Sequence, residues 1–179
     1  MADNENIKDY IRTVPDFPKP GIMFRDVTTL FSHTPGFRLM LDQLEQAVSH
    51  LQIDGVAGID ARGFIVGAAL ADRLGTGFIP VRKQGKLPAE TIAESYALEY
   101  GAATLELHRD AVPSGEHILL VDDLIATGGT ALAAVALLRR LGTHIAACAF
   151  IVDLPDLGGT ACLREDGHTV ISLCEFEGD

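Results

Sequence analysis

Apolar and polar positions fall into blocks along the chain, and from residue 55 onward these blocks alternate between two periods. Some runs are mainly apolar, end on a carboxylate and are as short as a buried strand, for example residues 55–60 and 117–123. Longer stretches, such as residues 62–75 and 129–142, repeat apolar positions at helical spacing and end on a glycine. Fully apolar strands that alternate with helices are typical of a parallel sheet covered on both sides. We therefore predict an α/β fold with a mostly parallel, twisted sheet and helices on both faces.

The same pattern predicts the other strands of this sheet. They are expected at residues 77–82, 91–100, 103–108, 144–154 and 168–176. A turn at Gly101 is expected to join the second of these strands to the third.

The first 34 residues are patterned differently from the rest. Four apolar side chains recur there at helical spacing and predict a short helix: Ile7, Tyr10, Ile11 and Val14. The segment VPDFPKPGIMFRD holds three prolines and a glycine, and is predicted to be irregular. Thr34 and Pro35 have the residue types of an N-cap and a first helical residue, so an amphipathic helix is expected to begin there. We expect residues 1–34 to form a small hood on an α/β core of residues 35–179, within one compact domain.

Charge and composition exclude several classes of protein. The chain has 179 residues and a formal charge of −11, from 14 basic and 25 acidic side chains. Nucleic acids and anionic membranes require a basic surface, so neither is an expected partner. No apolar run approaches the ~20 residues of a membrane span, and no basic segment precedes an apolar one at the N-terminus, so we expect a cytoplasmic protein.

Cys148, Cys162 and Cys174 are expected to be reduced thiols, and neither they nor the six histidines have metal-ligand spacing.

Candidate chemistry begins where a predicted strand ends, in the segment LLVDDLIATGGT from Leu119 to Thr130. Ligands of parallel α/β folds bind at this edge of the sheet. From Thr127 onward, threonines and two glycines precede a helix whose free amides favour a phosphate, yet no P-loop or dinucleotide motif is present. Asp122 and Asp123 would repel phosphate, so their natural partners are hydroxyl donors or a magnesium ion shared with phosphate oxygens. A ribose 5-phosphate offers a diol to the acids and a phosphate to the loop.

A basic cluster stands out in this acidic chain. Arg82, Lys83 and Lys86 lie within five residues of one another. Such a cluster favours a small anionic ligand, although an ordinary solvated loop has the same composition.

The segment from Leu119 to Thr130 resembles the 5-phosphoribosyl 1-pyrophosphate (PRPP) binding motif of the type I phosphoribosyltransferases. Four more stretches, in chain order, resemble the adenine-specific members of that family: FPKPGIMFRDVTTLF, DARGFIVGAALA, IPVRKQGKLP and SYALEYG. The resemblance runs from Phe17 to about Leu154 and is less distinctive beyond. It implies the family's fold and a transferase that converts adenine and PRPP to AMP and pyrophosphate in purine salvage. It also implies Mg²⁺ as cofactor, held mainly by PRPP near Asp122 and Asp123 rather than by a set of protein ligands.

The resemblance also implies a role for individual residues. The ribose phosphate of PRPP is expected to contact Asp122, Asp123, Ala126, Thr127, Gly128, Gly129 and Thr130. Pyrophosphate is expected at Asp60, Ala61, Arg62, Arg82, Lys83 and Lys86, of which the last three can reach the partner's site in a homodimer. Adenine is expected to stack on Phe24, with its edge recognised by the main chain of Met23 and Arg25. The implied catalytic residues are Arg62 and Glu99, with Glu99 as general acid or base beside Tyr100 on a mobile flap.

Two alternatives remain open from the sequence. The acceptor is hypoxanthine, guanine or orotate in other members of the wider family, although PGIMFRD matches the adenine enzymes. A transcription regulator that senses PRPP or purines on the same fold would need a DNA-binding module, which the acidic N-terminus does not offer.

Overall fold

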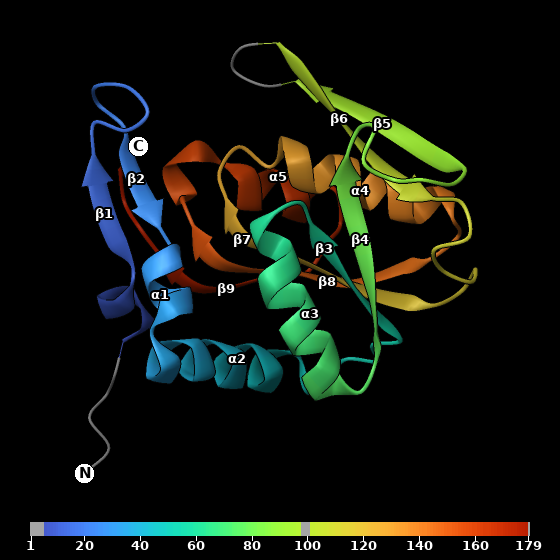
Figure 1. Cartoon of the computed structure of the whole chain (residues 1–179), viewed down its shortest axis with the longest axis horizontal. Helices are drawn as coiled ribbons and strands as arrows, with labels where there is room; N and C mark the ends of the chain where they lie inside the picture. The colour runs from blue at the N-terminus through green and yellow to red at the C-terminus, as the bar shows by residue number, and fades with distance from the viewer. Residues whose placement is uncertain (1–5, 98–100, 179) are drawn as a thin grey trace.

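A computed structural model describes residues 6–97 and 101–178 of the chain (Figure 1). A seven-stranded sheet crosses the molecule with helices on both faces, and a small two-stranded sheet stands beside it near the C-terminus. None of the described helices is long and apolar enough to cross a membrane.

The large sheet has the mostly parallel character predicted from the sequence. Its strands run in the order β5 (Thr91–Ala97), β6 (Ala102–His108), β4 (Gly77–Lys83), β3 (Gly55–Ile59), β7 (His117–Ile125), β8 (His144–Asp153) and β9 (Val170–Glu175). The five strands from β4 to β9 pair in parallel. The hairpin of β5 and β6 joins the edge of β4 antiparallel. Because all the parallel strands point the same way, their carboxyl ends lie along one edge of the sheet.

Helices cover both faces, as the alternation in the sequence predicts. On one side lie α2 (Thr34–Val48) and α3 (Arg62–Leu74), and on the other α4 (Gly129–Arg140) and α5 (Gly159–Glu165). Strand β7 shows the alternation, since Leu119 and Val121 join the hydrophobic cluster of α2 and α3, whereas Leu120 joins that of α4. The predicted end of α3 is confirmed, because Gly75 adopts a left-handed conformation with φ of 68°.

The N-terminal segment corrects two of the predictions. A 3-10 turn at Ile7–Tyr10 stands where the start of a helix was expected, and Val14 lies in strand β1 (Arg12–Pro15) instead. The proline-rich segment predicted to be irregular supplies β2 (Met23–Asp26), which pairs with β1 antiparallel. The physical reason is that the prolines lie at the end of β1 and in the connecting loop, so they remove no amide from the middle of the ladder.

The start of α2 also differs by one residue from the prediction. His33 is the N-cap, and its Nδ1 accepts a hydrogen bond of 3.2 Å from the Gly36 amide. Thr34 and Pro35 therefore lie inside the first turn, where proline costs no hydrogen bond. A short helix α1 (Thr28–Ser32) joins the small sheet to α2, and its Leu30 is buried in the same cluster as Leu44 and Leu70.

Candidate active site

Three cavities open at the carboxyl edge of the parallel strands, and they share residues. Their volumes are about 210, 430 and 540 Å³, and Arg62 lines all three. Arg62 is the first residue of α3, which follows β3 directly. Two glycines set this position, since a Cβ at Gly58 would lie 2.6 Å from the Gly63 carbonyl and one at Gly63 2.8 Å from the Val121 carbonyl. The start of α3 is thereby packed against β3 and β7.

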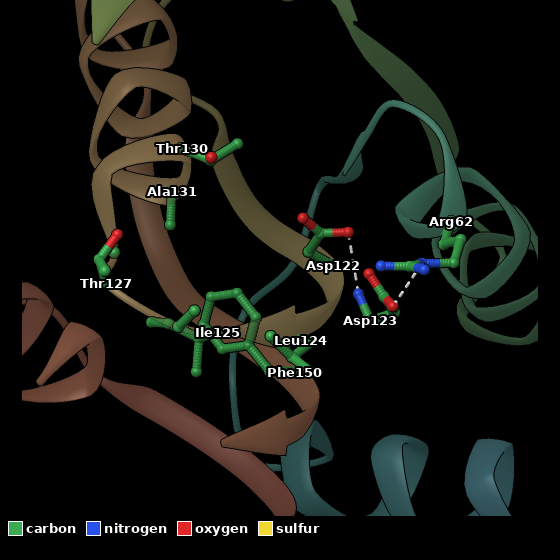
Figure 2. A pocket seen from close by; sticks show the side chains of 11 residues that line it. Arg62, Asp122, Asp123, Leu124, Ile125, Thr127, Thr130, Ala131 and Phe150 are labelled. Carbon is green, nitrogen blue, oxygen red and sulfur yellow. Dashed lines mark hydrogen bonds and ion pairs between the residues drawn. The ribbon is translucent and has the colours of Figure 1, made fainter. Parts of the chain in front are cut away.

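The smallest cavity lies between the end of β7 and the start of α4 (Figure 2). Thr127 and Thr130 flank one side of it, and Asp122, Asp123 and Arg62 lie on the opposite side. The loop amides and hydroxyl groups at the N-terminus of α4 suit a phosphate. The acids on the opposite side suit hydroxyl groups, so the cavity has the two-part chemistry that the sequence motif indicated.

A second pair of close-packed glycines, Gly128 and Gly159, fixes the shape of the loop before α4, and the sequence prediction included only the first of them. Gly128 caps α4 with φ of 85°, and a Cβ there would lie 3.0 Å from the Cα of Gly159. The Gly159 amide donates a hydrogen bond of 2.9 Å to the Ala126 carbonyl. A Cβ at Gly159 would overlap that same carbonyl. The pair of glycines at 158–159 was visible in the sequence, but nothing local indicated that it packs against residue 128.

The two acids of β7 differ in their surroundings. Asp123 is buried, and its Oδ2 lies 2.6 Å from Arg62 Nε in an ion pair. The Asp123 amide donates a hydrogen bond of 2.9 Å to Asp122 Oδ1. Burial, and then the neighbouring charge of Asp123, raise the pKa of Asp122 well above its usual value. A hydroxyl donor, or a cation, placed between the two carboxylates would relieve this repulsion.

The second cavity, of about 430 Å³, adjoins the first through Arg62, both acids and Thr130. Lys83, Tyr96 and the Asp60–Ala61 peptide, which is cis, also line it.

Of the three residues in the basic cluster, Lys83 lines this cavity, and Arg82 contacts the cavity residue Asp60. Arg82 Nε lies 3.3 Å from Asp60 Oδ2, and Arg82 also donates a hydrogen bond of 3.1 Å to the Lys86 carbonyl. Lys86 does not line any of the three cavities. The sequence prediction also missed Tyr96, because a tyrosine in a strand is an ordinary packing residue.

The third and largest cavity lies between the N-terminal segment and the core. Its lining consists of residues 19–25, Arg62, Leu124, Ala126, Leu154 and Leu157. The guanidinium of Arg62 lies 5.8 Å from the centre of the Phe24 ring, and Phe17 packs edge-on to that ring at 5.1 Å. An aromatic face opposite apolar side chains suits a flat ring system. Leu154 and Leu157 were not predicted, because they lie about 130 residues after Phe24 in the chain.

Two of the remaining predicted features concern catalysis and metal binding. Glu99 and Tyr100 lie outside the described residues. No group of three or more histidine, cysteine, aspartate or glutamate side chains suited to a metal ion occurs in the described part of the chain. The adjacent carboxylates of Asp122 and Asp123 fit a magnesium ion that takes its other ligands from phosphate and water.

Comparison with known proteins gives consistent results. Residues 28–162 match the family of the phosphoribosyl transferase domain. The chain is 56% identical over 179 residues, covering 100% of both proteins, to the adenine phosphoribosyltransferase of Dinoroseobacter shibae. Its fold matches the crystal structure of adenine phosphoribosyltransferase from Thermoanaerobacter pseudethanolicus with a TM-score of 0.91 and 46% identity, over 95% of this chain and 98% of that one. The enzyme of Saccharomyces cerevisiae, complexed with adenine and an imino-altritol bisphosphate, matches with a TM-score of 0.87 and 37% identity, over 94% of this chain and 96% of that one.

Proposed function

The chain belongs to the adenine phosphoribosyltransferase family, and from that premise we propose how its three cavities divide the reaction. The reaction of the family is the conversion of adenine and PRPP to AMP and pyrophosphate, a transfer of a pentosyl group in purine salvage. The relatives give no support to a regulator on the same fold or to a different acceptor base.

One observation carries the proposal, namely that Arg62 lines all three cavities. We assign the smallest cavity to the ribose 5-phosphate, with the loop from Ala126 to Thr130 at the phosphate and the two acids at the diol. The cavity with Lys83 takes the pyrophosphate, and the cavity with Phe24 takes adenine. The anomeric carbon then lies near Arg62, between the base that attacks and the pyrophosphate that leaves.

The residues of this chain lower the barrier by position and charge. Negative charge builds up on the departing pyrophosphate while the sugar becomes cationic, so fixed cations beside the leaving group stabilise the transition state. Arg62 and Lys83 supply that charge within the second cavity, and Arg82 and Lys86 are assigned to the pyrophosphate as well. The Phe24 ring and the leucines opposite it hold the base in line with the sugar. Because both reactants are already oriented, the reaction loses less translational and rotational entropy than an encounter of two free solutes.

Recognition of adenine is assigned to the main chain of β2. Met23 and Arg25 are two residues apart, so their amides and carbonyls point toward the same edge of the strand. Within the described residues β2 pairs only with β1, so one edge of β2 is free of a neighbouring strand. The Met23 carbonyl would accept from the amine of adenine, and the Arg25 amide would donate to N1.

Magnesium, when bound with PRPP, would supply positive charge at the pyrophosphate. Asp122 and Asp123 would hold it from the protein side, either directly or through its water ligands. A bound cation would favour the ionised form of Asp122, which burial disfavours.

The assignment extends to features that lie outside the cavities. Glu99 is the proposed general acid or base, on a flap with Tyr100 that closes over the base. Residues 1–34 act as the base-binding hood on the core of residues 35–179. The active form is a cytoplasmic homodimer, in which the basic residues from Arg82 to Lys86 lie near the partner's site.

Product analysis tests the proposed function directly. The protein is mixed with Mg²⁺, PRPP and each of adenine, hypoxanthine, guanine and orotate, and the nucleotides are separated and quantified. AMP with stoichiometric pyrophosphate is the expected product, and only with adenine. Turnover of another base, or binding of PRPP without turnover of any base, would contradict the proposal.

A further inference from the structure

The last described residues of the chain, Phe176 to Gly178, connect two elements that line the base cavity. They follow β9, and the Phe176 amide extends the sheet by one hydrogen bond of 3.0 Å to the Asp153 carbonyl. Figure 1 shows this C-terminal end running up beside β1 and β2 rather than away from the molecule. No part of the family motifs lies in this segment, and the reaction described above makes no use of it.

The contacts of Arg25 carry the inference. Its guanidinium lies 4.5 Å from the centre of the Phe176 ring and donates a hydrogen bond of 3.1 Å to the Glu177 carbonyl. Its other terminal nitrogen donates a hydrogen bond of 2.7 Å to Thr13 Oγ1 on β1. The side chain of Arg25 is thus held at three points, and all three lie on the hood or on the C-terminal segment. The main chain of the same residue is the group assigned to adenine.

The other end of the segment is attached to the core side of the cavity. The Gly178 amide donates a hydrogen bond of 2.8 Å to Asp156 Oδ2. Asp156 belongs to the turn Pro155–Leu157, and Leu157 lines the base cavity together with Leu154. One short segment therefore joins the strand that recognises the base to the apolar wall opposite it.

We propose that Phe176 is a positioning residue, which holds β2 at the correct distance from the ribose site through the side chain of Arg25. This inference rests on the proposed function, since it concerns how adenine is presented to the sugar. A base displaced by about 1 Å from its line of attack can lose about 10²-fold in rate. The hood sheet has only two strands, so it depends on such contacts for its placement more than a strand inside the large sheet does.

The decisive variant is Phe176→Ala, assayed with both substrates varied. We expect KM for adenine to rise about tenfold and KM for PRPP to change less than twofold, because the ribose cavity is built on β7 and α4. Phe176→Tyr keeps the aromatic face and should restore the wild-type values. Equal changes in both KM values, or no change in either, would overturn the proposal.

Lys8→Ala is the matched control. Lys8 Nζ lies 5.2 Å from the centre of the Phe176 ring, so this variant removes a cation from the same ring without touching Arg25. It should leave KM for adenine within twofold of the wild type. A rise as large as that of Phe176→Ala would mean that the ring merely anchors the terminus, which would overturn the positioning role.

Coupling between the two residues supplies a test that does not depend on one variant. Arg25→Met removes the guanidinium with all three of its contacts but retains the main chain, and it should raise KM for adenine at least as much as Phe176→Ala does. The double variant should be no worse than Arg25→Met alone, because the contact with Phe176 is already lost in that variant. Additive effects would contradict the proposal. If the wild type makes no AMP, the proposed function fails instead, and the two failures are distinguishable.

Discussion

The ribose-phosphate cavity and the base cavity are built in opposite ways. The first lies on β7 and α4, in the middle of the large sheet, and its acids and its loop occur within twelve consecutive residues. The second is assembled from a peripheral two-stranded sheet, from Arg62 and from leucines near residues 124 and 157. In the proposed function, the ribose phosphate is therefore recognised by a continuous motif on the central sheet. The base is recognised by a separate, peripheral element.

The largest expected effect concerns the base cavity, where main-chain groups are assigned to recognition. The base hypoxanthine carries an acceptor and a donor where adenine carries a donor and an acceptor, so the Met23 carbonyl and the Arg25 amide would be left unpaired. Sites of this kind discriminate by about 10⁴-fold. We expect kcat/KM for adenine to exceed that for hypoxanthine by about this factor. Steady-state assays with each base measure it.

Two variants in the base cavity separate main chain from side chain. Met23→Leu should keep the preference for adenine, while Phe24→Ala should weaken all bases together because it removes only the stacking face. Use of hypoxanthine within about tenfold of adenine by the wild type, a difference of ~1.4 kcal/mol, would refute the assignment of the hood.

The next effect concerns the ribose cavity, where the side chains themselves carry recognition. Replacing both acids, Asp122→Asn with Asp123→Asn, should lower kcat/KM for PRPP by about 10³-fold. The melting temperature should stay close to that of the wild type. The pKa of Asp122 is raised in the folded protein, so its charge costs stability at neutral pH, and the amide removes that cost. This gain offsets the loss of the ion pair between Asp123 and Arg62.

The surface variant Asp110→Asn is the control for charge alone, since that side chain is exposed. It should behave as the wild type does in both assays. Normal saturation by PRPP in the double variant would show that the acids do not bind the diol.

A smaller effect is expected at Gly128, where close packing of the loop before α4 can be distinguished from backbone strain by comparison with Gly75. Gly128→Ala places a Cβ against Gly159 and should reduce kcat/KM for PRPP by about 10²-fold. Gly75→Ala carries the same left-handed strain of about 1–2 kcal/mol, but its Cβ would meet no atom within 4 Å. Both variants should therefore lose stability, measured by denaturant unfolding, while only the first loses activity. Equal activity in the two variants would argue against close packing at the loop.

The smallest effect is a pH dependence of stability in the hood. Asp26 accepts hydrogen bonds from Thr28 and from Arg12, and these lower its pKa to about 2. An aspartate with a lowered pKa stabilises the fold above its unfolded value of 3.8, and this contribution disappears as the pH falls through about 2. Asp26→Asn should cost about 1 kcal/mol at pH 7, since solvent screens the exposed Arg12. The two unfolding free energies should converge in acid, and a constant difference down to pH 2 would contradict the assigned pKa.

The sequence predicted the core of the molecule well, because its elements follow from local pattern. Residues 117–123 are apolar up to Asp122 and form β7 as expected, extended by two residues. The hood was predicted poorly. Its strands β1 and β2 are stabilised by pairing with each other across a loop, and the hydrophobic pattern of each segment alone does not indicate such pairing. Prolines in that loop suggested irregular structure, although none of them interrupts a paired amide in the middle of a strand.

The candidate site likewise has a part that could be predicted from the sequence and a part that could not. The sequence by itself determined the acids and the glycine loop, because a strand end, a loop and a helix start are adjacent in the chain and fix one another's geometry. Only the tertiary structure decided which distant residues complete the site, namely Gly159 beneath the loop, Tyr96 at the second cavity, Leu157 opposite Phe24 and Phe176 beside Arg25. The physical reason is that these contacts form when separate elements pack against one another, and packing depends on the shape of the whole core rather than on any local period.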